Sequence, residues 1–587
     1  MKSKKVISLL LAGLLTAGMM SGCGGQAGND ASGGADSKED TPAETKEEDA
    51  SAGEDAAGDD AGTPADDAVA DDDIPAPDPN ERYEITYTGY WSDSTYEDGS
   101  YCETMLEDAL DCDITVVKQE GNDALNVMLA SGEMPDCATL SGKTSAWMYE
   151  QELVRTIPRN MVEKYCPSLI KNYDENPLLY AQTLNPENDQ EFNFLAGVTF
   201  QFVGYYLNCD YYRYDWIQNL GIDLGVNVEQ VSDRLYVADD GIELSKFIEI
   251  IDAFVNQDPD GNGENDTVGI TGQNLTHGQY FSAYGFHSGV NEVDGKAEMY
   301  YVLPEYKEFL KGFAELNARG LVDPDIIQGN RQLMWDKVNS GNAGYYIVST
   351  NALQSSWALD RPPLQLLERI PEATILATPG IKPDGGTVQS LVNPSPAYEN
   401  FFVRADIDDQ KLAKILQFVE LAWFGGGDKD FHASMIYGEK DVDWKWNDEG
   451  TAPVKINNLA NGERGTWTFG QLGQDADISG WIADDPLFNA GNKYWTGPDG
   501  SWMKFQHPEY KADISNVTDL ATINAEVSGD INAYVGEYRT QVFLGQKDLD
   551  STWDEYLAEL ERLGYSRLMG EYEKLDPLQD IIASYGN

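Results

Sequence analysis

The chain has 587 residues, enough for two or three packed lobes with a cleft between them. It carries 40 Lys and Arg against 101 Asp and Glu, a formal net charge of −61. Nucleic acid is therefore excluded as a partner, because binding it depends on neutralising phosphates. Aromatic residues make up 11% of the chain, too many for a wholly disordered acidic protein, so most of it is expected to fold.

The first 23 residues have the pattern of a bacterial export signal. Three lysines among the first five residues precede an apolar run over 6–20, which is shorter than the ~20 residues of a transmembrane helix. Residues 20–23, Met-Ser-Gly-Cys, resemble a lipobox, and this resemblance implies that Cys23 is acylated. We expect a signal peptide over 1–22 and a protein held by its lipid at the extracellular face of the bacterial cell membrane.

An acidic segment without an apolar run follows the signal. Residues 24–80 contain 18 acidic side chains against two lysines, and most of the others are Gly, Ala, Ser, Thr and Pro. Such a segment cannot bury enough apolar surface to fold, and its charges repel one another. The sequence predicts that 23–80 is a lipidated cysteine followed by a disordered tether.

Beyond the tether, apolar periodicity predicts strands alternating with helices. Residues 83–91 and 113–119 are predicted strands, whereas 101–110 and 123–131 have helical spacing. This order is typical of a mainly parallel sheet covered by helices, which predicts an α/β fold. Further helices are predicted at 244–255, at 412–421 and from 551, where Thr552 and Glu555 have the spacing of a capping box and Gly564 ends the pattern.

The chain lacks the short motifs of several enzyme classes. It has no G-x-S-x-G, no G-x-x-x-x-G-K-[ST] and no H-E-x-x-H sequence, and its four histidines are scattered singly. We therefore expect no enzyme activity and no catalytic residues. A surface glycosidase is an alternative, because 101 carboxylates always allow two to be nominated as acid and nucleophile.

Cysteines do not form the framework of the fold. No C-x-x-C pair occurs, so zinc-ribbon and thioredoxin-like sites have no sequence support. Five cysteines remain after Cys23, which leaves at least one unpaired thiol and leaves open the state of the others: Cys102, Cys112, Cys137, Cys166 and Cys209.

Residues 258–266, Asp-Pro-Asp-Gly-Asn-Gly-Glu-Asn-Asp, match the first part of an EF-hand loop. Oxygen ligands at alternate positions of a tight loop suit Ca²⁺, which takes six to eight oxygens. Position 12 is Gly269 rather than Glu, and 268–270 is a predicted strand, so we expect a structural ion rather than a signalling EF-hand. A surface turn without an ion is the alternative. The expected ligands are Asp258, Asp260, Asn262, the backbone carbonyl of Glu264, and Asp266.

Several segments together resemble the extracellular solute-binding proteins of family 1, which are lipoproteins that serve ABC transporters. The matching segments are 126–136 (NVMLASGEMPD), 215–221 (DWIQNLG), the loop 258–266, 304–324 (from PEY to GLVDP) and 552–564 (TWDEYLAELERLG). The resemblance implies two α/β lobes of the type II periplasmic-binding-protein kind, joined by hinge strands. It also implies a monomer with an ABC transporter permease as partner. Thr267 stands where the family's loop often has Glu, so that ligand is in doubt.

With this resemblance, the chain is divided into two discontinuous lobes. Lobe 1 is expected to contain 81–205 and about 395–440, and lobe 2 to contain 206–394 and about 441–587. A saccharide cleft needs aromatic platforms beside polar groups that satisfy hydroxyls. The candidates on loops after predicted strands are Tyr90, Trp91, Asp93, Ser141, Trp147 and Trp357, with Trp467 and Trp481 in irregular sequence. In contrast, Trp216, Trp423 and Trp553 lie on apolar helix faces and are expected in the core.

The acidic composition disfavours a polyanionic ligand, because the mean field of the protein would repel it. A neutral oligosaccharide is therefore the expected ligand, unless a local cluster of arginines changes the balance. A peptide or another small solute stays open as ligand, and so does a sensor subunit that presents its ligand to a membrane kinase.

Overall fold

The structure, a computed structural model, describes residues 74–585. Its gaps are 90–95, 119–126, 130, 141–147, 150, 186–187, 198–205, 207, 355–360, 392–399, 452, 458, 460–462, 470–485, 498 and 513–517. The signal segment, Cys23 and nearly all of the acidic tether therefore lie outside the described residues.

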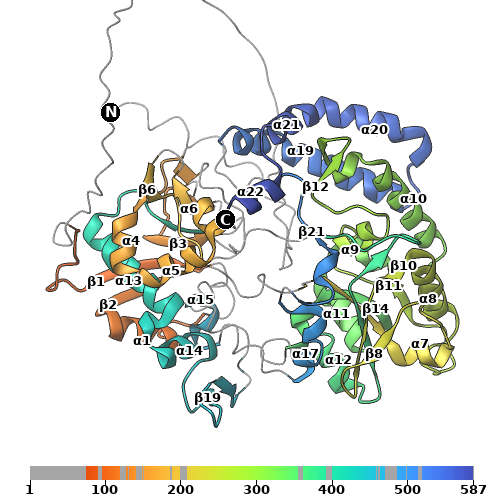
Figure 1. Cartoon of the computed structure of the whole chain (residues 1–587), viewed down its shortest axis with the longest axis horizontal. Coiled ribbons are helices and arrows are strands. Elements are labelled where there is room, and N and C mark those ends of the chain that lie inside the picture. Colours follow the sequence, from red (N-terminus) through yellow and green to blue (C-terminus); the bar gives the residue numbers. More distant parts are fainter. Residues whose placement is uncertain are drawn as a thin grey trace, which may run out of the picture.

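Two bodies lie side by side, each built around its own sheet (Figure 1). Lobe 1 is the body around the sheet of order β18-β3-β1-β2. Strands β1 (Tyr83–Thr88), β2 (Cys112–Val116) and β3 (Cys137–Leu140) run parallel, and β18 (Asn400–Val403) pairs antiparallel with β3. The chain thus completes this sheet only after it has built most of lobe 2.

Helices cover the sheet of lobe 1, as the predicted α/β class requires. Helix α1 (Tyr101–Leu110) has the predicted bounds, and α13 (Asp409–Phe424) contains the predicted helix 412–421. The remaining elements of lobe 1 are β4 (Ile157–Pro158), α4 (Arg159–Tyr165), α5 (Pro167–Glu175), α6 (Pro177–Thr183), β5 (Leu184–Asn185), β6 (Asn188–Phe192), α14 (Lys429–Tyr437), β19 (Trp444–Trp446), β20 (Pro453–Lys455) and α15 (Thr466–Phe469).

Lobe 2 is the body around a six-stranded mixed sheet of order β11-β14-β7-β15-β9-β8. The chain enters it at β7 (Asn208–Arg213), which pairs antiparallel with β14 (Ala343–Ser349) and β15 (Ile375–Thr378). Because β14 and β15 run antiparallel to β7, their carboxyl ends lie beside the amino end of β7, where the chain arrives from lobe 1. The edge strands are β11 (Val268–Ile270) and β8 (Val228–Gln230), and β9 (Leu235–Ala238) lies between β15 and β8.

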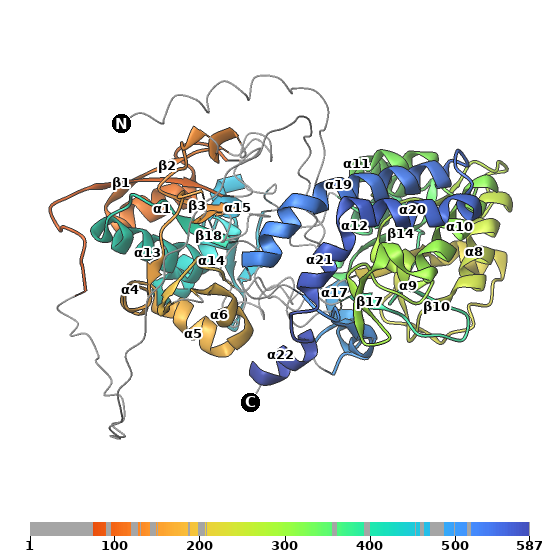
Figure 2. The ribbon, with the colours of Figure 1, turned by 90° about the horizontal axis from the view of Figure 1, so that it is seen from above.

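Helices and short strand pairs complete lobe 2. Figure 2 shows the longest helix, α19 (Thr518–Phe543), extending across lobe 2 towards lobe 1. The other elements are α7 (Tyr214–Leu220), β10 (Ile242–Glu243), α8 (Leu244–Asn256), α9 (Gly278–Ser282), β12 (Val290–Val293), β13 (Lys296–Met299), α10 (Pro304–Ala318), α11 (Arg331–Asn339), α12 (Leu364–Arg369), β16 (Ile381–Lys382), β17 (Ser390–Leu391), α17 (Pro486–Ala490), α18 (Asn492–Trp495), β21 (Gln506–His507), α20 (Leu549–Leu563) and α21 (Tyr565–Tyr572). The last helix, α22 (Leu578–Tyr585), contacts α6 of lobe 1.

Each lobe has its own hydrophobic core. The tryptophans predicted to be core are buried, Trp423 in lobe 1 and Trp216 and Trp553 in lobe 2. Phe469 belongs to the core of lobe 1, where its ring stacks on Tyr87 with centroids 5.8 Å apart. Lobe 1 therefore extends beyond the predicted boundary near residue 440, and the remaining lobe boundaries stay predictions.

One predicted helix start is wrong. Helix α20 begins at Leu549, and Asp548 caps it by accepting a hydrogen bond from the Ser551 backbone N–H at 2.8 Å. The Thr552 hydroxyl donates to the Asp548 carbonyl instead of forming a capping box. Gly564 does end this helix in the left-handed conformation, with φ of 107°, as predicted.

The five cysteines other than Cys23 are all free and all buried. This answers the question of their state that the sequence left open.

Candidate ligand-binding and calcium sites

The predicted ligand-binding residues lie outside the described part of the chain. They are Tyr90, Trp91, Asp93, Ser141, Trp147 and Trp357, together with Trp481. Trp467 lies in α15, but its side chain is outside the description as well. In the sequence, residues 90–93 follow β1 and Ser141 follows β3 directly, and these strands are parallel neighbours. Their role in ligand binding stays a prediction.

A buried carboxyl lies on a central strand of the lobe 2 sheet, near the strand end where the chain arrives from lobe 1. Asp210, on β7, is fully buried and pairs in register with Thr378 at the end of β15. Its Oδ2 accepts a hydrogen bond from the Tyr345 hydroxyl at 3.2 Å, whereas its Oδ1 has no partner among the described residues. Burial raises the pKa of Asp210 to about 8, against the opposing effect of the hydrogen bond from Tyr345. Asp210 is therefore mostly protonated at neutral pH.

Gln279 fixes the backbone around this carboxyl. Its Nε2 donates to the carbonyls of Asn208, at 3.2 Å, and Pro379, at 3.0 Å. These two carbonyls belong to the start of β7 and to the residue after β15. The amide thus holds together the start of β7 and the end of β15.

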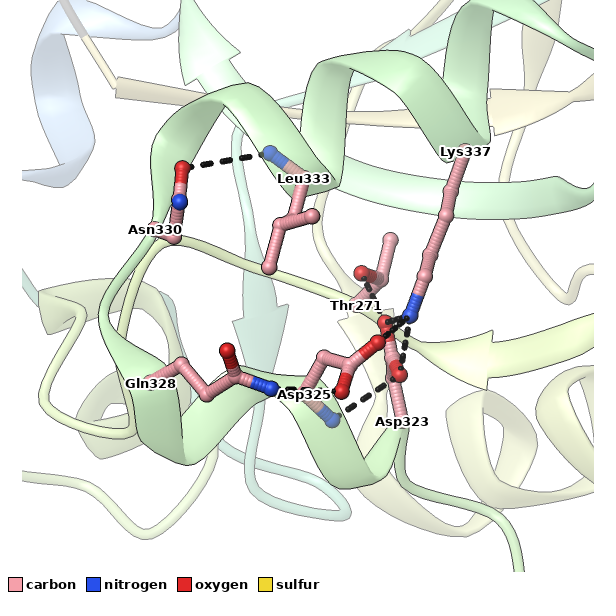
Figure 3. A network of polar contacts seen from close by, with 7 residues as sticks. All are labelled: Thr271, Asp323, Asp325, Gln328, Asn330, Leu333 and Lys337. Carbon is pink, nitrogen blue, oxygen red and sulfur yellow. Dashed lines mark hydrogen bonds and ion pairs between the residues drawn. The ribbon is translucent and has the colours of Figure 1, made fainter.

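A network of polar contacts joins helix α11 to the end of β11 (Figure 3). The Lys337 ammonium lies 2.6 Å from Asp323 Oδ1 and 2.6 Å from Asp325 Oδ2. The Thr271 hydroxyl donates to Asp323 Oδ2 at 2.7 Å, and Asp323 also accepts from the Asp325 backbone N–H at 3.1 Å. Because Asp323 is 2% exposed, these partners offset the cost of burying its carboxylate. The Gly320–Pro324 segment of the family resemblance therefore has a structural role here.

The predicted calcium loop folds as a tight turn of acidic side chains. Asp258 has a left-handed backbone, with φ of 46°, and its Oδ2 accepts a hydrogen bond from the Gly263 N–H at 2.9 Å. Gly263 and Gly261 also have positive φ, of 91° and 71°. Glycine suits both positions because it adopts this conformation without steric cost.

Asn262 brings two carboxylates of this loop together. Its Nδ2 donates to Asp260 Oδ2 at 3.0 Å and to Asp266 Oδ1 at 3.1 Å. The amide N–H groups thus supply the positive partial charge that a cation would otherwise supply. A flip of the Asn262 side-chain amide would turn its oxygen, instead of its nitrogen, towards the Asp260 and Asp266 carboxylates.

The donor set fits Ca²⁺. Asp258 Oδ1 is buried without a hydrogen-bond partner, and all the candidate ligands are hard oxygens, as this ion prefers. Thr267 is not available to the loop, because its hydroxyl is buried and donates to the Phe254 carbonyl at the end of α8. In this conformation, no group of three or more His, Cys, Asp or Glu among the described residues is arranged as a metal site.

Sequence comparison finds relatives among transport proteins. No family model matches the chain. The chain is 24% identical over 484 residues to the fructooligosaccharide ABC transporter substrate-binding protein FusA of Streptococcus pneumoniae, covering 76% of this chain and 81% of FusA. It is also 25% identical over 247 residues to lipoprotein LipO of Bacillus subtilis, covering 40% of this chain and 43% of LipO.

Solved structures with the same fold cover 84% of this chain. The alginate-binding protein AlgQ2, in a structure without calcium ion, has a TM-score of 0.63 and 14% identity over 84% of this chain and 98% of AlgQ2. An EF-hand mutant of FusA from S. pneumoniae in complex with fructo-nystose has a TM-score of 0.60 and 16% identity, with the same coverage. Calcium is thus named for the AlgQ2 structure, and an EF-hand is named for the FusA structure.

These relatives confirm the resemblance that the sequence motifs predicted. Within the described ranges, no helix has the length and apolar character needed to cross a membrane. The chain is a homologue of ABC transporter substrate-binding proteins and has the two-lobed α/β fold of solute-binding proteins.

Proposed function

We propose that this protein captures an oligosaccharide outside the cell and delivers it to the permease of an ABC importer. The observation that carries the proposal is the similarity to FusA, which extends over 76% of the chain and includes both lobes of the fold. The lipobox-like sequence at 20–23 and the acidic segment 24–80 suit a receptor held at the extracellular face of the membrane by a lipid on Cys23.

The mechanism is ligand-driven closure of two lobes. A ligand that contacts both lobes binds the closed form better, so its binding free energy shifts the equilibrium from open to closed. Sugar rings present apolar C–H faces and hydroxyls, which suit aromatic platforms and polar side chains. We assign these roles to Tyr90, Trp91, Trp147 and Trp357 as platforms and to Asp93 and Ser141 as hydrogen-bonding groups. The strongly acidic chain favours a neutral ligand over a polyanion.

We further propose that a structural Ca²⁺ binds the loop 258–266. Asp258, Asp260, Asn262, Asp266 and the Glu264 carbonyl would hold it. When bound, the ion offsets the mutual repulsion of the loop's carboxylates. The loop connects α8 to β11, so the ion would stabilise lobe 2 without contacting the sugar.

A ligand screen tests the proposed function. The thermal unfolding midpoint is measured with neutral oligosaccharides, uronate oligomers and peptides in calcium buffer. A ligand at ~100 times its Kd adds about 2.7 kcal/mol, which gives a readily measured shift. A shift confined to one saccharide class supports the proposal, whereas shifts confined to peptides would replace it by a peptide receptor.

Variants of the assigned platforms refine the test. We expect Trp91→Ala, Trp147→Ala and Trp357→Ala to weaken binding of the selected saccharide. Trp446→Ala, in the β19–β20 hairpin, is the control and is expected to leave affinity unchanged. Equal affinity in all four variants would remove these residues from the proposed site.

Two further measurements address the competing functions. A glycosidase would convert the oligosaccharide, so chromatography of the ligand after incubation separates hydrolysis from reversible binding. A sensor subunit would copurify with a membrane kinase, whereas a transport receptor would copurify with a permease.

A further inference from the structure

A second group of polar side chains lies where lobe 2 is linked to lobe 1. Strands β17 and β21 pair in parallel, with Leu391 opposite His507. The chain then passes from Leu391 to β18 of lobe 1, which begins at Asn400. Figure 1 shows β21 (Gln506–His507) on the flank of lobe 2 that faces lobe 1, and the chain continues from the carboxyl end of this strand. His507 and Glu509 lie at this end.

The Glu509 carboxyl lies directly on the backbone of Gly289. A Cβ placed on Gly289 would lie 2.1 Å from Glu509 Oε1 and 2.5 Å from its Cδ, so any other residue would displace the carboxyl. The Tyr510 N–H donates to the Val290 carbonyl at 2.8 Å, which fixes the two segments side by side. Glycine at 289 thus makes room for a carboxyl at this position.

His287 lies on the same turn. Its Nδ1 accepts a hydrogen bond from the Gly289 N–H at 3.3 Å, so the neutral ring carries its proton on Nε2. The Asn291 side chain stiffens the turn by donating to the carbonyls of His287, at 3.0 Å, and Gly289, at 2.9 Å. Burial, and secondarily the charge of His507, lower the pKa of His287 to about 4. The imidazole is therefore neutral at physiological pH.

These groups have unused hydrogen-bonding capacity. Among the described residues, the Glu509 carboxyl makes no hydrogen bond, and burial raises its pKa to about 7. The side chain is nevertheless not completely covered, because Glu509 and His507 are both partly exposed. A mostly buried carboxyl without a protein donor is costly in a folded protein, and a partner supplied by a ligand would offset that cost.

We propose that Glu509, His287 and His507 form a subsite for the hydroxyls of a neutral sugar ring held between the lobes. This inference rests on the proposed function and names residues for it. The Glu509 oxygens accept hydrogen bonds from ring hydroxyls, and the His287 Nε2–H donates one. A uronate ring would place its own carboxylate beside Glu509, where the two like charges would repel. The subsite therefore selects neutral rings over uronates.

The test measures binding by calorimetry with the full-length protein. The probes are neutral trisaccharides of glucose, mannose, xylose and fructose, and trigalacturonate. For the neutral trisaccharide that the wild type binds, we expect Glu509→Gln to weaken binding on the order of 10- to 100-fold, as for loss of charge-assisted hydrogen bonds. His507→Gln is expected to have a smaller effect. Glu308→Gln, at an exposed position on α10, is the control and is expected to bind like the wild type.

The outcomes distinguish this subsite from the proposed function. If the wild type binds a neutral trisaccharide and folded Glu509→Gln binds it equally well, the subsite is wrong and the proposed function stands. If the wild type prefers trigalacturonate, the neutral selectivity is wrong. If the wild type binds no saccharide, both proposals fail. The thermal midpoint of Glu509→Gln shows whether the variant is folded, and a folded variant with weakened binding supports the subsite.

Discussion

The ammonium nitrogen of Lys337, on α11, lies 2.6 Å from Oδ1 and 2.8 Å from Oδ2 of the buried Asp323 carboxylate. The same ammonium contacts Asp325, so one cation serves two carboxylates. Although burial lowers the pKa of Lys337, the hydrogen bonds and charges of Asp323 and Asp325 outweigh it and raise the pKa. Through the Thr271 hydroxyl, which donates to Asp323, this ion pair connects α11 to the end of β11. The contacts therefore hold these two elements of lobe 2 together.

Replacing this cation is expected to destabilise lobe 2. In Lys337→Met the Asp323 carboxylate stays buried without its counter-ion, which costs about 3 to 5 kcal/mol in the free energy of unfolding. Urea denaturation at pH 7 measures the change. The matched control is Lys246→Met, which removes the Lys246–Glu249 pair from the surface of α8 and is expected to cost less than about 1 kcal/mol. Equal losses in the two variants would contradict a special role for Lys337.

Asp210 is expected to make stability fall as pH rises. Its folded pKa of about 8 is above the usual value of 3.8, so between these limits the folded protein keeps a proton that the unfolded chain has lost. In that window the free energy of unfolding decreases by at most about 1.4 kcal/mol per pH unit from this group. Below this pH window the Asp210 carboxyl is protonated in both the folded and the unfolded state, so it no longer makes the free energy of unfolding depend on pH.

Asp210→Asn removes this titration. The wild type loses stability between pH 5 and pH 8 through this group, and the variant does not. The free energy of unfolding of Asp210→Asn minus that of the wild type is therefore expected to increase steadily over this range. The slope is the informative quantity, because any packing cost of the amide is the same at every pH. Asp189→Asn, at an exposed position of β6, supplies the control, with a difference that stays constant. A constant difference in Asp210→Asn as well would show that the buried carboxyl does not hold its proton.

The fold was largely predictable because it depends on periodic patterns. Apolar spacing predicted α1 at its observed bounds, and it predicted α8 and α13 closely. The start of α20 was missed because Asp548 and Thr552 can both cap a helix, and only the packed structure shows which one does. The extension of lobe 1 to Phe469 was missed for a similar reason, since no local pattern records which lobe a segment packs against.

The site was less predictable, because its groups come from distant parts of the chain. Asp210 is a polar residue in an aromatic strand, which was a usable signal that the sequence interpretation passed over. Glu509 gave no comparable signal, because its position depends on contact with Gly289, 220 residues earlier in the sequence. The tether and the predicted aromatic platforms fall outside the described residues and stay predictions.

The buried cysteines are expected to be unreactive in the folded protein. Burial raises the pKa of the Cys137, Cys166 and Cys209 thiols well above the usual value, and a thiol, unlike a thiolate, reacts slowly with disulfide reagents. Residues 24–587, which lack Cys23, should show almost no reaction with Ellman's reagent until denaturant is added, and five thiols afterwards. A disulfide would reduce the number of thiols found after denaturation and contradict the free state.

Calcium is expected to stabilise the protein through the loop 258–266. Addition of Ca²⁺ to chelator-treated protein should raise the thermal midpoint, by the equivalent of about 2.7 kcal/mol at 100 times the Kd, and calorimetry should detect one site. Asp258→Asn keeps the left-handed backbone, which asparagine also tolerates, but removes one ligand charge. It should therefore weaken calcium binding without unfolding the turn.

Asp294→Asn is a matched control, because Asp294 also has a positive φ, of 52°, in the β12–β13 turn. Absence of a binding heat in the wild type, or the same calcium affinity in both variants, would show that the acidic loop is a surface turn without an ion.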